Sequence, residues 1–208
     1  MALGFPKESF RRLVTIERQG LFNHFWDVMH PSSGDSLLEI GGPTHGFSDI
    51  AGRFRTVTLA NIAPRGWIYE TVTNYALMRA DGCQLPFSDR AFDYVFSNAT
   101  LEHIPQDKWP AFAREIQRVA AKGFFVSTPN YWFPFEPHYL LPGFQWVPEG
   151  GKRFLLFRLG LKLGHKTKHN YEVICLPRKS QLLRAFEGAR VDGWGIVVPR
   201  HWIVWSKF

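Results

Sequence analysis

The residues best suited to chemistry begin with a glycine-rich turn, Gly41-Gly42-Pro43-Thr44-His45-Gly46, which follows the apolar run SLLEI. Glycines between a strand and a helix let the backbone approach a ligand closely and aim free N–H groups at an anion. The same glycines would also suit a tight turn without a ligand. Their spacing is not GxGxxG, which argues against a pyrophosphate site. The turn is a candidate cofactor loop.

Three more polar residues stand where apolar runs end. Asn61 follows TVTLA, Asp81 follows NYALMRA, and Asn98 closes FDYVFSN. In open α/β sheets the ligand sits beyond the carboxyl ends of the strands. These residues and the glycine turn should therefore meet at one edge of a sheet, and this convergence is a stronger signal than any single motif.

The elements that would position these residues alternate between strand and helix. The patterns predict helices at 8–29, 45–54, 104–123 and 177–189, and strands at 36–42, 56–62, 74–82, 92–98, 123–130, 194–198 and 201–208. Alternating strands and helices favour a parallel sheet in a three-layer sandwich. The last two strands are joined too closely for a crossover, so they must pair antiparallel.

Composition narrows the class of protein. At 208 residues the chain suits one domain, 1–208, with an N-terminal helical segment at 1–35 and an irregular insertion at 131–172. It lacks an apolar run of membrane-spanning length and the features of a secretory signal. Its two cysteines, Cys83 and Cys175, are too few for a disulfide framework. The expected setting is the reduced cytoplasm.

Three segments together resemble the class I S-adenosylmethionine-dependent methyltransferases, in the group that acts on small molecules. The stretch ADGCQLPFSDRAFDYVFSNATLEHI resembles the family's long middle signature, and LLEIGGPTHG lies where the family has its glycine-rich first motif. REIQRVAAKGFFVSTPN resembles the helix and fifth strand that follow. The resemblance covers residues 36–130 and implies a Rossmann-like fold with a seven-stranded, mostly parallel sheet and an antiparallel last strand.

The resemblance also implies a cofactor, S-adenosylmethionine, and positions for its parts. Carried over by position, the methionine end of the cofactor is surrounded by Glu39, Gly41, Gly42 and Gly46, and its amino group lies over Asn98. The ribose faces Asn61. The adenine is bound by Asp81 together with Gly82 and Cys83. The expected reaction is in-line transfer of a methyl group to a small-molecule or lipid-linked acceptor.

Two histidines are candidate bases for removing a proton from the acceptor. His103 follows the fourth strand, and His138 lies in FPFEPHY beside Glu136. Each could instead be structural, His103 as a helix cap and His138 in a loop with a surface ion pair. Tyr131 and Trp132, with Glu136, are candidate acceptor contacts, although core packing explains an aromatic cluster equally well. No metal site is predicted.

The insertion holds most of the net charge. Lys152, Arg153, Arg158, Lys162, Lys166 and Lys168 account for six of the net +7, with no acid between residues 151 and 170. A single basic segment on a near-neutral body points to a local anionic partner rather than to nucleic acid. Its leucines and cations fall on opposite sides of a helical plot. The segment is either a peripheral contact with an anionic membrane or a lid with a solvated outer face.

Rival functions follow from departures from the family pattern. Pro43 and His45 replace usual glycines, and Asn61 replaces the usual ribose-binding acid. These changes motivate a catalytically inactive methyltransferase fold kept as a binding module. The pI near 9.6 motivates an RNA methyltransferase, although the charge is confined to one segment. A nucleotide-dependent oxidoreductase is disfavoured because GxGxxG is missing. The oligomeric state is not predicted.

Overall fold

The computed structural model describes residues 7–42, 52–62, 74–136, 138–139, 141–158, 172–195 and 198–208. Its main feature is a seven-stranded sheet of order β3-β2-β1-β4-β5-β9-β8. The strands are β1 (Ser36–Ile40), β2 (Thr56–Asn61), β3 (Tyr75–Arg79), β4 (Phe92–Asn98), β5 (Ala120–Pro129), β8 (Arg190–Trp194) and β9 (His201–Lys207). Strands β1 to β5 pair in parallel, and β9 pairs antiparallel with β5 and β8. The predicted Rossmann-like sheet with its antiparallel last strand is confirmed.

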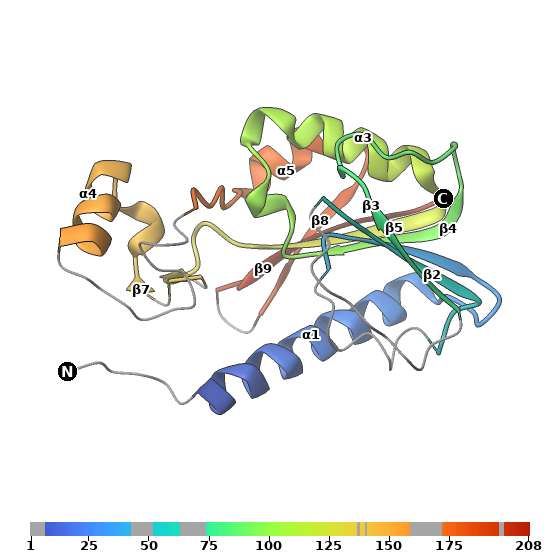
Figure 1. Cartoon of the computed structure of the whole chain (residues 1–208), viewed down its shortest axis with the longest axis horizontal. Helices are drawn as coiled ribbons and strands as arrows, with labels where there is room; N and C mark the ends of the chain where they lie inside the picture. The colour runs from blue at the N-terminus through green and yellow to red at the C-terminus, as the bar shows by residue number, and fades with distance from the viewer. Residues whose placement is uncertain are drawn as a thin grey trace.

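Helices cover both faces of the sheet (Figure 1). Helix α1 (Lys7–Met29) packs Phe22 and Phe25 against Phe96 and Phe125 on one face. Helices α3 (Trp109–Val119) and α5 (Lys179–Ala185) cover the other face. The buried residues of α3 recur at helical spacing, as an amphipathic helix on a sheet requires: Trp109, Phe112, Ala113, Ile116 and Val119. The predicted three layers are present.

Several predicted boundaries are wrong: the helix predicted at 104–123 is Trp109–Val119, and the one predicted at 177–189 is Lys179–Ala185. Helix α3 ends at Val119, not at Gly123, because Ala120 already pairs with Phe92 of β4. Gly123 lies within the sheet instead, where the neighbouring strand passes so close that a Cβ would lie 2.6 Å from the Ser206 carbonyl oxygen. The next-to-last strand is Arg190–Trp194, not residues 194–198, because the chain turns at Gly195, whose φ is 144°. Most of the predicted helix at 45–54 lies outside the described residues.

The insertion forms a separate small layer beyond the sheet (Figure 1). It contains the hairpin β6 (Phe135–Glu136) and β7 (Leu141–Pro142), the turn η3 (Phe144–Trp146), α4 (Glu149–Arg153) and the π-helical turn η4 (Phe154–Arg158). Tyr139, Phe144 and Leu156 form its own buried cluster. Residues 159–171 of the segment lie outside the described part of the chain. Among the described helices, none is long and apolar enough to cross a membrane.

An ion-pair cluster ties the start of β5 to the starts of β1 and β4. The Lys122 ammonium lies 2.5 Å from Asp35 Oδ1 and 3.0 Å from Asp93 Oδ1. Burial opposes the charged form of both carboxylates. Hydrogen bonds from Lys122 and from the Ser32 and Ser36 backbones outweigh it and hold the pKa of each carboxyl below its ordinary value. The cluster fixes the strand ends opposite the predicted site.

We predict that Lys122→Met lowers the urea midpoint of unfolding at pH 7, because both aspartates lose the cation that favours their charged form. The stabilisation is present above the unfolded-state pKa of aspartate, about 3.9. It is lost as pH falls further, through the lowered native pKa values, so wild type and variant should converge there. Lys207→Met, at the exposed end of β9, is the control. Equal midpoints for wild type and K122M at pH 7 would contradict the assignment.

Candidate functional site

A cavity of about 400 Å³ opens at the carboxyl ends of the central strands. The ends of β1, β2 and β3 contribute Gly41, Asn61 and Asp81, and the turn after β4 contributes Thr100 and His103. Its position between β1 and β4 is where strand order reverses, because β2 and β3 lie on one side and β5 on the other. Open α/β sheets bind ligands at this switch point.

Gly41 lines the floor of the cavity, and Gly42 follows it in the chain. Gly41 has a φ of 76°, a conformation that glycine adopts readily, and a Cβ there would collide with the Thr100 side chain. At Gly42, a Cβ would collide with the carboxylate of Glu39, which is fully buried beneath it. The glycines are therefore required by how closely the backbone passes these two side chains. The floor is backbone rather than side chain.

The Asp81 turn forms a second wall. Asp81 Oδ1 accepts a hydrogen bond from the Cys83 amide at 2.9 Å, and the Asp81 carbonyl accepts one from Gln84. Gly82 is pressed against helix α3, since a Cβ there would lie 2.8 Å from the Phe112 ring. Burial, together with the nearby Asp81 charge, raises the pKa of the Cys83 thiol to about 11. Cys83 is thus a neutral wall residue at physiological pH.

The turn after β4 carries unusual backbone geometry. Ala99 has a φ of 52°, which is uncommon for a residue with a Cβ and often marks a functional turn. Thr100 Oγ1 donates to the Ile40 carbonyl at 3.1 Å and so ties this turn to the end of β1. Asn98 is held by Ser127, whose hydroxyl donates to the Asn98 amide oxygen. Asn98 adjoins the cavity but does not line it.

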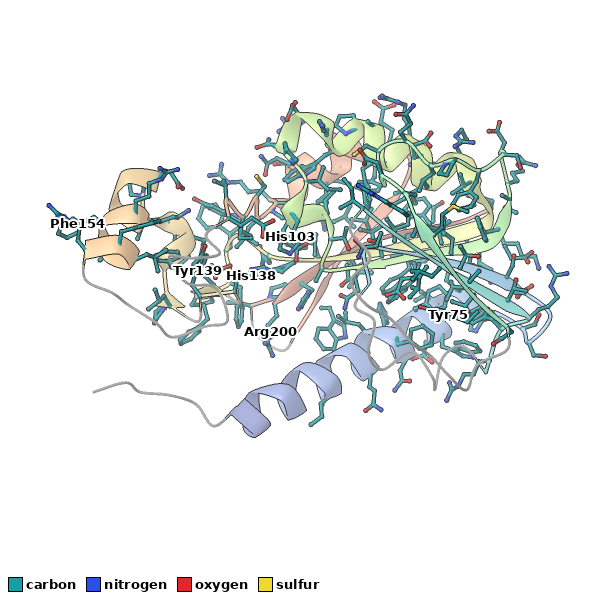
Figure 2. All side chains as sticks on the ribbon, in the orientation of Figure 1. Tyr75, His103, His138, Tyr139, Phe154 and Arg200 are labelled. Atoms are coloured by element: carbon teal, nitrogen blue, oxygen red, sulfur yellow. The ribbon has the colours of Figure 1, made fainter. Side chains whose placement is uncertain are left out.

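His103 is fixed in its wall position by Glu172. Its Nδ1 lies 2.8 Å from Glu172 Oε1, and both residues line the cavity. The ring also meets His138 edge-on, with centroids 5.1 Å apart. Both histidines are labelled in Figure 2. His138 Nδ1 in turn lies 2.8 Å from Glu136 Oε1, and both residues are buried. The two predicted bases, His103 and His138, therefore lie side by side, and Nδ1 of each ring contacts a glutamate carboxylate.

The predicted acceptor contacts divide into two groups. Glu136 joins the histidine pair. Tyr131 and Trp132 instead stack on the Arg178 guanidinium, at 4.7 Å and 5.3 Å from their ring centroids, and do not line the cavity. Their proposed role in acceptor binding stays a prediction.

The structure brings most of the predicted cofactor residues to one place. Gly41, Asn61, Asp81, Gly82 and Cys83 line the cavity. Glu39 lies directly under Gly42, and Gly46 lies outside the described residues.

Sequence reasoning missed Ala99, Thr100 and Glu172. The first two belong to the quoted middle signature but are of types that seldom draw attention. Glu172 carried no signal, because its partner His103 is 69 residues away in the sequence.

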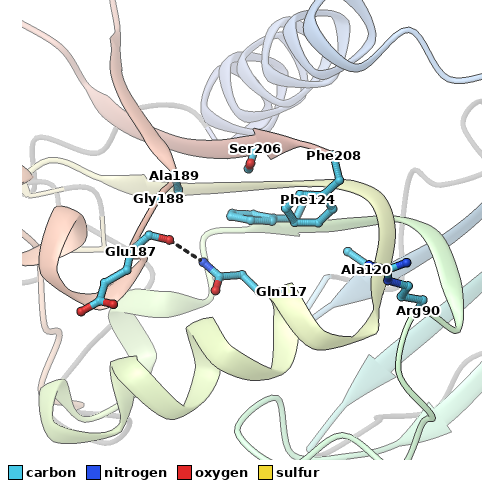
Figure 3. A pocket seen from close by; sticks show the side chains of 9 residues that line it. All are labelled: Arg90, Gln117, Ala120, Phe124, Glu187, Gly188, Ala189, Ser206 and Phe208. Carbon is cyan, nitrogen blue, oxygen red and sulfur yellow. Dashed lines mark hydrogen bonds between the residues drawn. The ribbon is translucent and has the colours of Figure 1, made fainter.

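A second cavity, of about 500 Å³, lies at the other end of β5 (Figure 3). It lies beside Ala120, where β5 begins, and Phe124, and is bordered by Glu187 and Ser206. The Gln117 side chain closes one side by donating to the Glu187 carbonyl at 3.3 Å. This is the amino end of a parallel strand, away from the edge where α/β sheets bind ligands. The cavity beside Gly41 and Asp81 is the better candidate.

Comparison with known proteins identifies the fold and a match to a methyltransferase domain. Residues 39–127 match a family model described as a methyltransferase domain. An uncharacterised protein of Mycobacterium tuberculosis is 37% identical over 59 residues, which cover 27% of this chain and 20% of that protein. A protein from Pyrococcus horikoshii superposes with a TM-score of 0.61 at 15% identity, over 97% of this chain and 92% of its own.

An S-adenosylmethionine-dependent methyltransferase from Mesorhizobium loti superposes with a TM-score of 0.57 at 13% identity, over 88% of this chain and 95% of its own. At such low identity the two structures establish the fold. The matched segment, 39–127, contains the cavity's glycine turn, the Asp81 turn and His103. Residues 39–127 of this chain thus match a methyltransferase domain, and the chain shares its fold with a structure described as an S-adenosylmethionine-dependent methyltransferase.

We predict that Cys83 reacts slowly with iodoacetamide. With a pKa of about 11, roughly one thiol in a thousand is ionised at pH 8, and the thiolate is the reactive form. The rate should rise about tenfold per pH unit below pH 11. A Cys175→Ser background isolates the Cys83 signal. Fast labelling at pH 7 would contradict the neutral, half-buried environment assigned to this wall of the cavity.

Proposed function

We propose that the chain transfers the methyl group of S-adenosylmethionine to a small-molecule or lipid-linked acceptor. The observation that carries this proposal is the convergence of Gly41, Asn61, the Asp81 turn and His103 on one cavity at the switch point of the sheet. A volume near 400 Å³ is in the range of sites that enclose small ligands and cofactors.

The residues present suit the parts of the cofactor. The Asp81 carboxylate and the backbone of Gly82 and Cys83 suit an adenine, which offers both hydrogen-bond donors and acceptors. Asn61 can accept a hydrogen bond from a ribose hydroxyl through its amide oxygen. The backbone at Gly41 and Gly42, above the Glu39 carboxylate, suits the methionine end, whose amino group carries a positive charge.

Methyl transfer requires mainly that the acceptor atom and the methyl group be aligned and that water be excluded. When bound, S-adenosylmethionine supplies a methyl group activated by a positively charged sulfur; the S–CH3 bond breaks as the bond to the acceptor forms. The rigid floor at Gly41 and the Asp81 turn would hold one reactant, and the wall formed by His103 and Glu172 would orient the other. Alignment of this kind can supply much of the rate acceleration.

We place the reacting group of the acceptor against His103. An acceptor hydroxyl loses a proton as it is methylated, and an imidazole with its Nδ1 held by Glu172 can receive that proton on its other nitrogen. His103 is partly exposed, with 32% of its side chain accessible, so an acceptor can reach it.

Two rival functions make different predictions. An inactive binding module, motivated by Pro43, His45 and Asn61, would bind S-adenosylmethionine weakly or not at all. An RNA methyltransferase would bind RNA with a steep salt dependence. Cofactor affinity separates the first rival from the proposal.

We predict that Asp81→Ala weakens S-adenosylmethionine binding about ten- to a hundredfold, the loss expected when a hydrogen bond to a charged group is removed. Isothermal calorimetry measures the affinity, and circular dichroism checks that the variant is folded. Asp27→Ala, on the exposed side of α1, is the matched control. Unchanged affinity in D81A would remove the adenine assignment. An absence of binding to folded wild type would favour the inactive module.

We further propose that the tip of the insertion contacts an anionic membrane that carries the acceptor. Phe154 and Phe157 expose 55% and 48% of their surface, and Trp146 exposes 46%. Phe154 points away from the body of the molecule (Figure 2). Lys152, Arg153 and Arg158 surround these rings in the sequence. Exposed aromatic rings beside cations suit the boundary between headgroups and acyl chains.

We predict that the double variant F154S/F157S binds anionic vesicles at least about tenfold more weakly, because each ring loses apolar burial worth on the order of 1 kcal/mol. Sedimentation with phosphatidylglycerol vesicles measures the partition coefficient. Leu183→Ser is the control, since Leu183 is similarly exposed, at 47%, but lies on α5. Equal binding of wild type and the double variant would leave the insertion as a cover with a solvated outer face.

A further inference from the structure

A cluster of two histidines and a buried carboxylate lies beside the cavity, which is lined by one of its members, His103. Glu102, His103 and His138 each offer a ligand atom, and these atoms all lie within 4.8 Å of one another. Glu102 and His103 belong to the turn η1 (Leu101–His103), whereas His138 comes from the insertion. The cluster therefore forms only because the insertion folds back onto the turn after β4.

Glu102 is the most unusual member. Its side chain is fully buried, and only Oε2 has a partner, the Thr128 hydroxyl at 3.1 Å. Oε1 is buried without a hydrogen-bond donor among the described residues. A buried carboxylate oxygen left in this way is costly, because the lost hydration is not replaced. A bound cation would satisfy it.

The two histidines have the second contacts that metal ligands usually have. His103 Nδ1 faces Glu172 Oε1 and His138 Nδ1 faces Glu136 Oε1, both at 2.8 Å. A histidine that binds a metal usually makes such a bond through its other nitrogen, which fixes the ring and raises its basicity. With Nδ1 of each ring on a carboxylate, Nε2 is the nitrogen that we assign to the cation.

Charge also favours a cation. Three carboxylates, Glu102, Glu136 and Glu172, converge on two imidazoles. Protonated imidazoles would balance Glu136 and Glu172, but neither ring hydrogen bonds to Glu102 Oε1. Ligand atoms 2.0–2.2 Å from a tetrahedral zinc ion stand roughly 3.3–3.6 Å apart, so atoms at the full 4.8 Å separation would close by about an ångström or slightly more on binding.

We propose that Glu102, His103 and His138 bind a divalent transition-metal cation, with open positions facing the cofactor cavity. Two imidazoles and one carboxylate suit Zn²⁺, Co²⁺, Mn²⁺ or Fe²⁺ better than Mg²⁺, which prefers oxygen ligands. This departs from the sequence-based expectation of no metal, which could not connect His138 with residues 35 positions earlier.

The cation gives the proposed methyl transfer a more definite substrate class. This step rests on the proposed function. A metal lowers the pKa of a coordinated hydroxyl, so the acceptor oxygen binds as its anion and the released proton goes to solvent. His103 then acts as a ligand rather than as the base. The acceptor would be a hydroxyl compound with a second oxygen placed to chelate the cation.

Cobalt titration of the whole chain tests the site without an acceptor. We expect one equivalent of Co²⁺ to bind and produce visible absorption bands. The near-isosteric variants E102Q, H103Q and H138Q should each weaken the affinity at least about tenfold, in line with the loss of a metal ligand or of its support. His30→Asn is the control, since His30 lies at the exposed end of α1. Mg²⁺ should not displace Co²⁺.

The outcomes separate this inference from the proposed function. No Co²⁺ binding by wild type, or binding unchanged in all three folded variants, overturns the metal site. Calorimetry with S-adenosylhomocysteine on the same samples reports cofactor binding independently. A chain that binds the cofactor but not Co²⁺ remains a methyltransferase without a metal. A chain that binds Co²⁺ but not the cofactor keeps the metal site and loses the proposed function.

Discussion

The site depends on the hydrogen bonds that hold the ends of β1 and β4 together. The Ile40 carbonyl accepts bonds from the hydroxyls of Ser97 and Thr100, at 3.0 Å and 3.1 Å. These bonds press the chain after β4 against Gly41, so that no side chain fits there. At the switch point the backbone of Gly41 therefore forms part of the floor of the cavity, between the ends of β1 and β4.

Much of the fold could be predicted because it follows from periodic patterns. The apolar runs of β1 and β4 and the helical spacing of Phe112 and Ile116 are local signals. The boundaries at Val119 and Trp194 were missed because strand pairing decides them: Ala120 joins β4, and Gly195 turns the chain toward β9. Long-range pairing leaves little trace in a short window of sequence.

In the candidate site, too, the residues with a local sequence signal could be predicted, and those placed by long-range packing could not. Gly41, Asn61 and Asp81 could be predicted because each ends a parallel strand, and such ends meet at one edge. The residues around His103 could not be predicted. Glu172 and His138 reach His103 from a long irregular insertion, where no periodicity predicts which side chains meet. The same insertion carries the exposed rings of Phe154 and Phe157, so the proposed acceptor chemistry and the proposed membrane contact both depend on how it packs.

The central claim is that the cavity between Gly41 and Asp81 binds S-adenosylmethionine. A crystal structure of the chain with S-adenosylhomocysteine tests this most directly. The account predicts the adenine beside Asp81 and Cys83, the ribose at Asn61, and the amino acid end over Gly41 and Gly42, with the sulfur directed toward His103. Ligand bound elsewhere, for example in the cavity at the start of β5, would contradict the account, as would an empty cavity at saturating ligand.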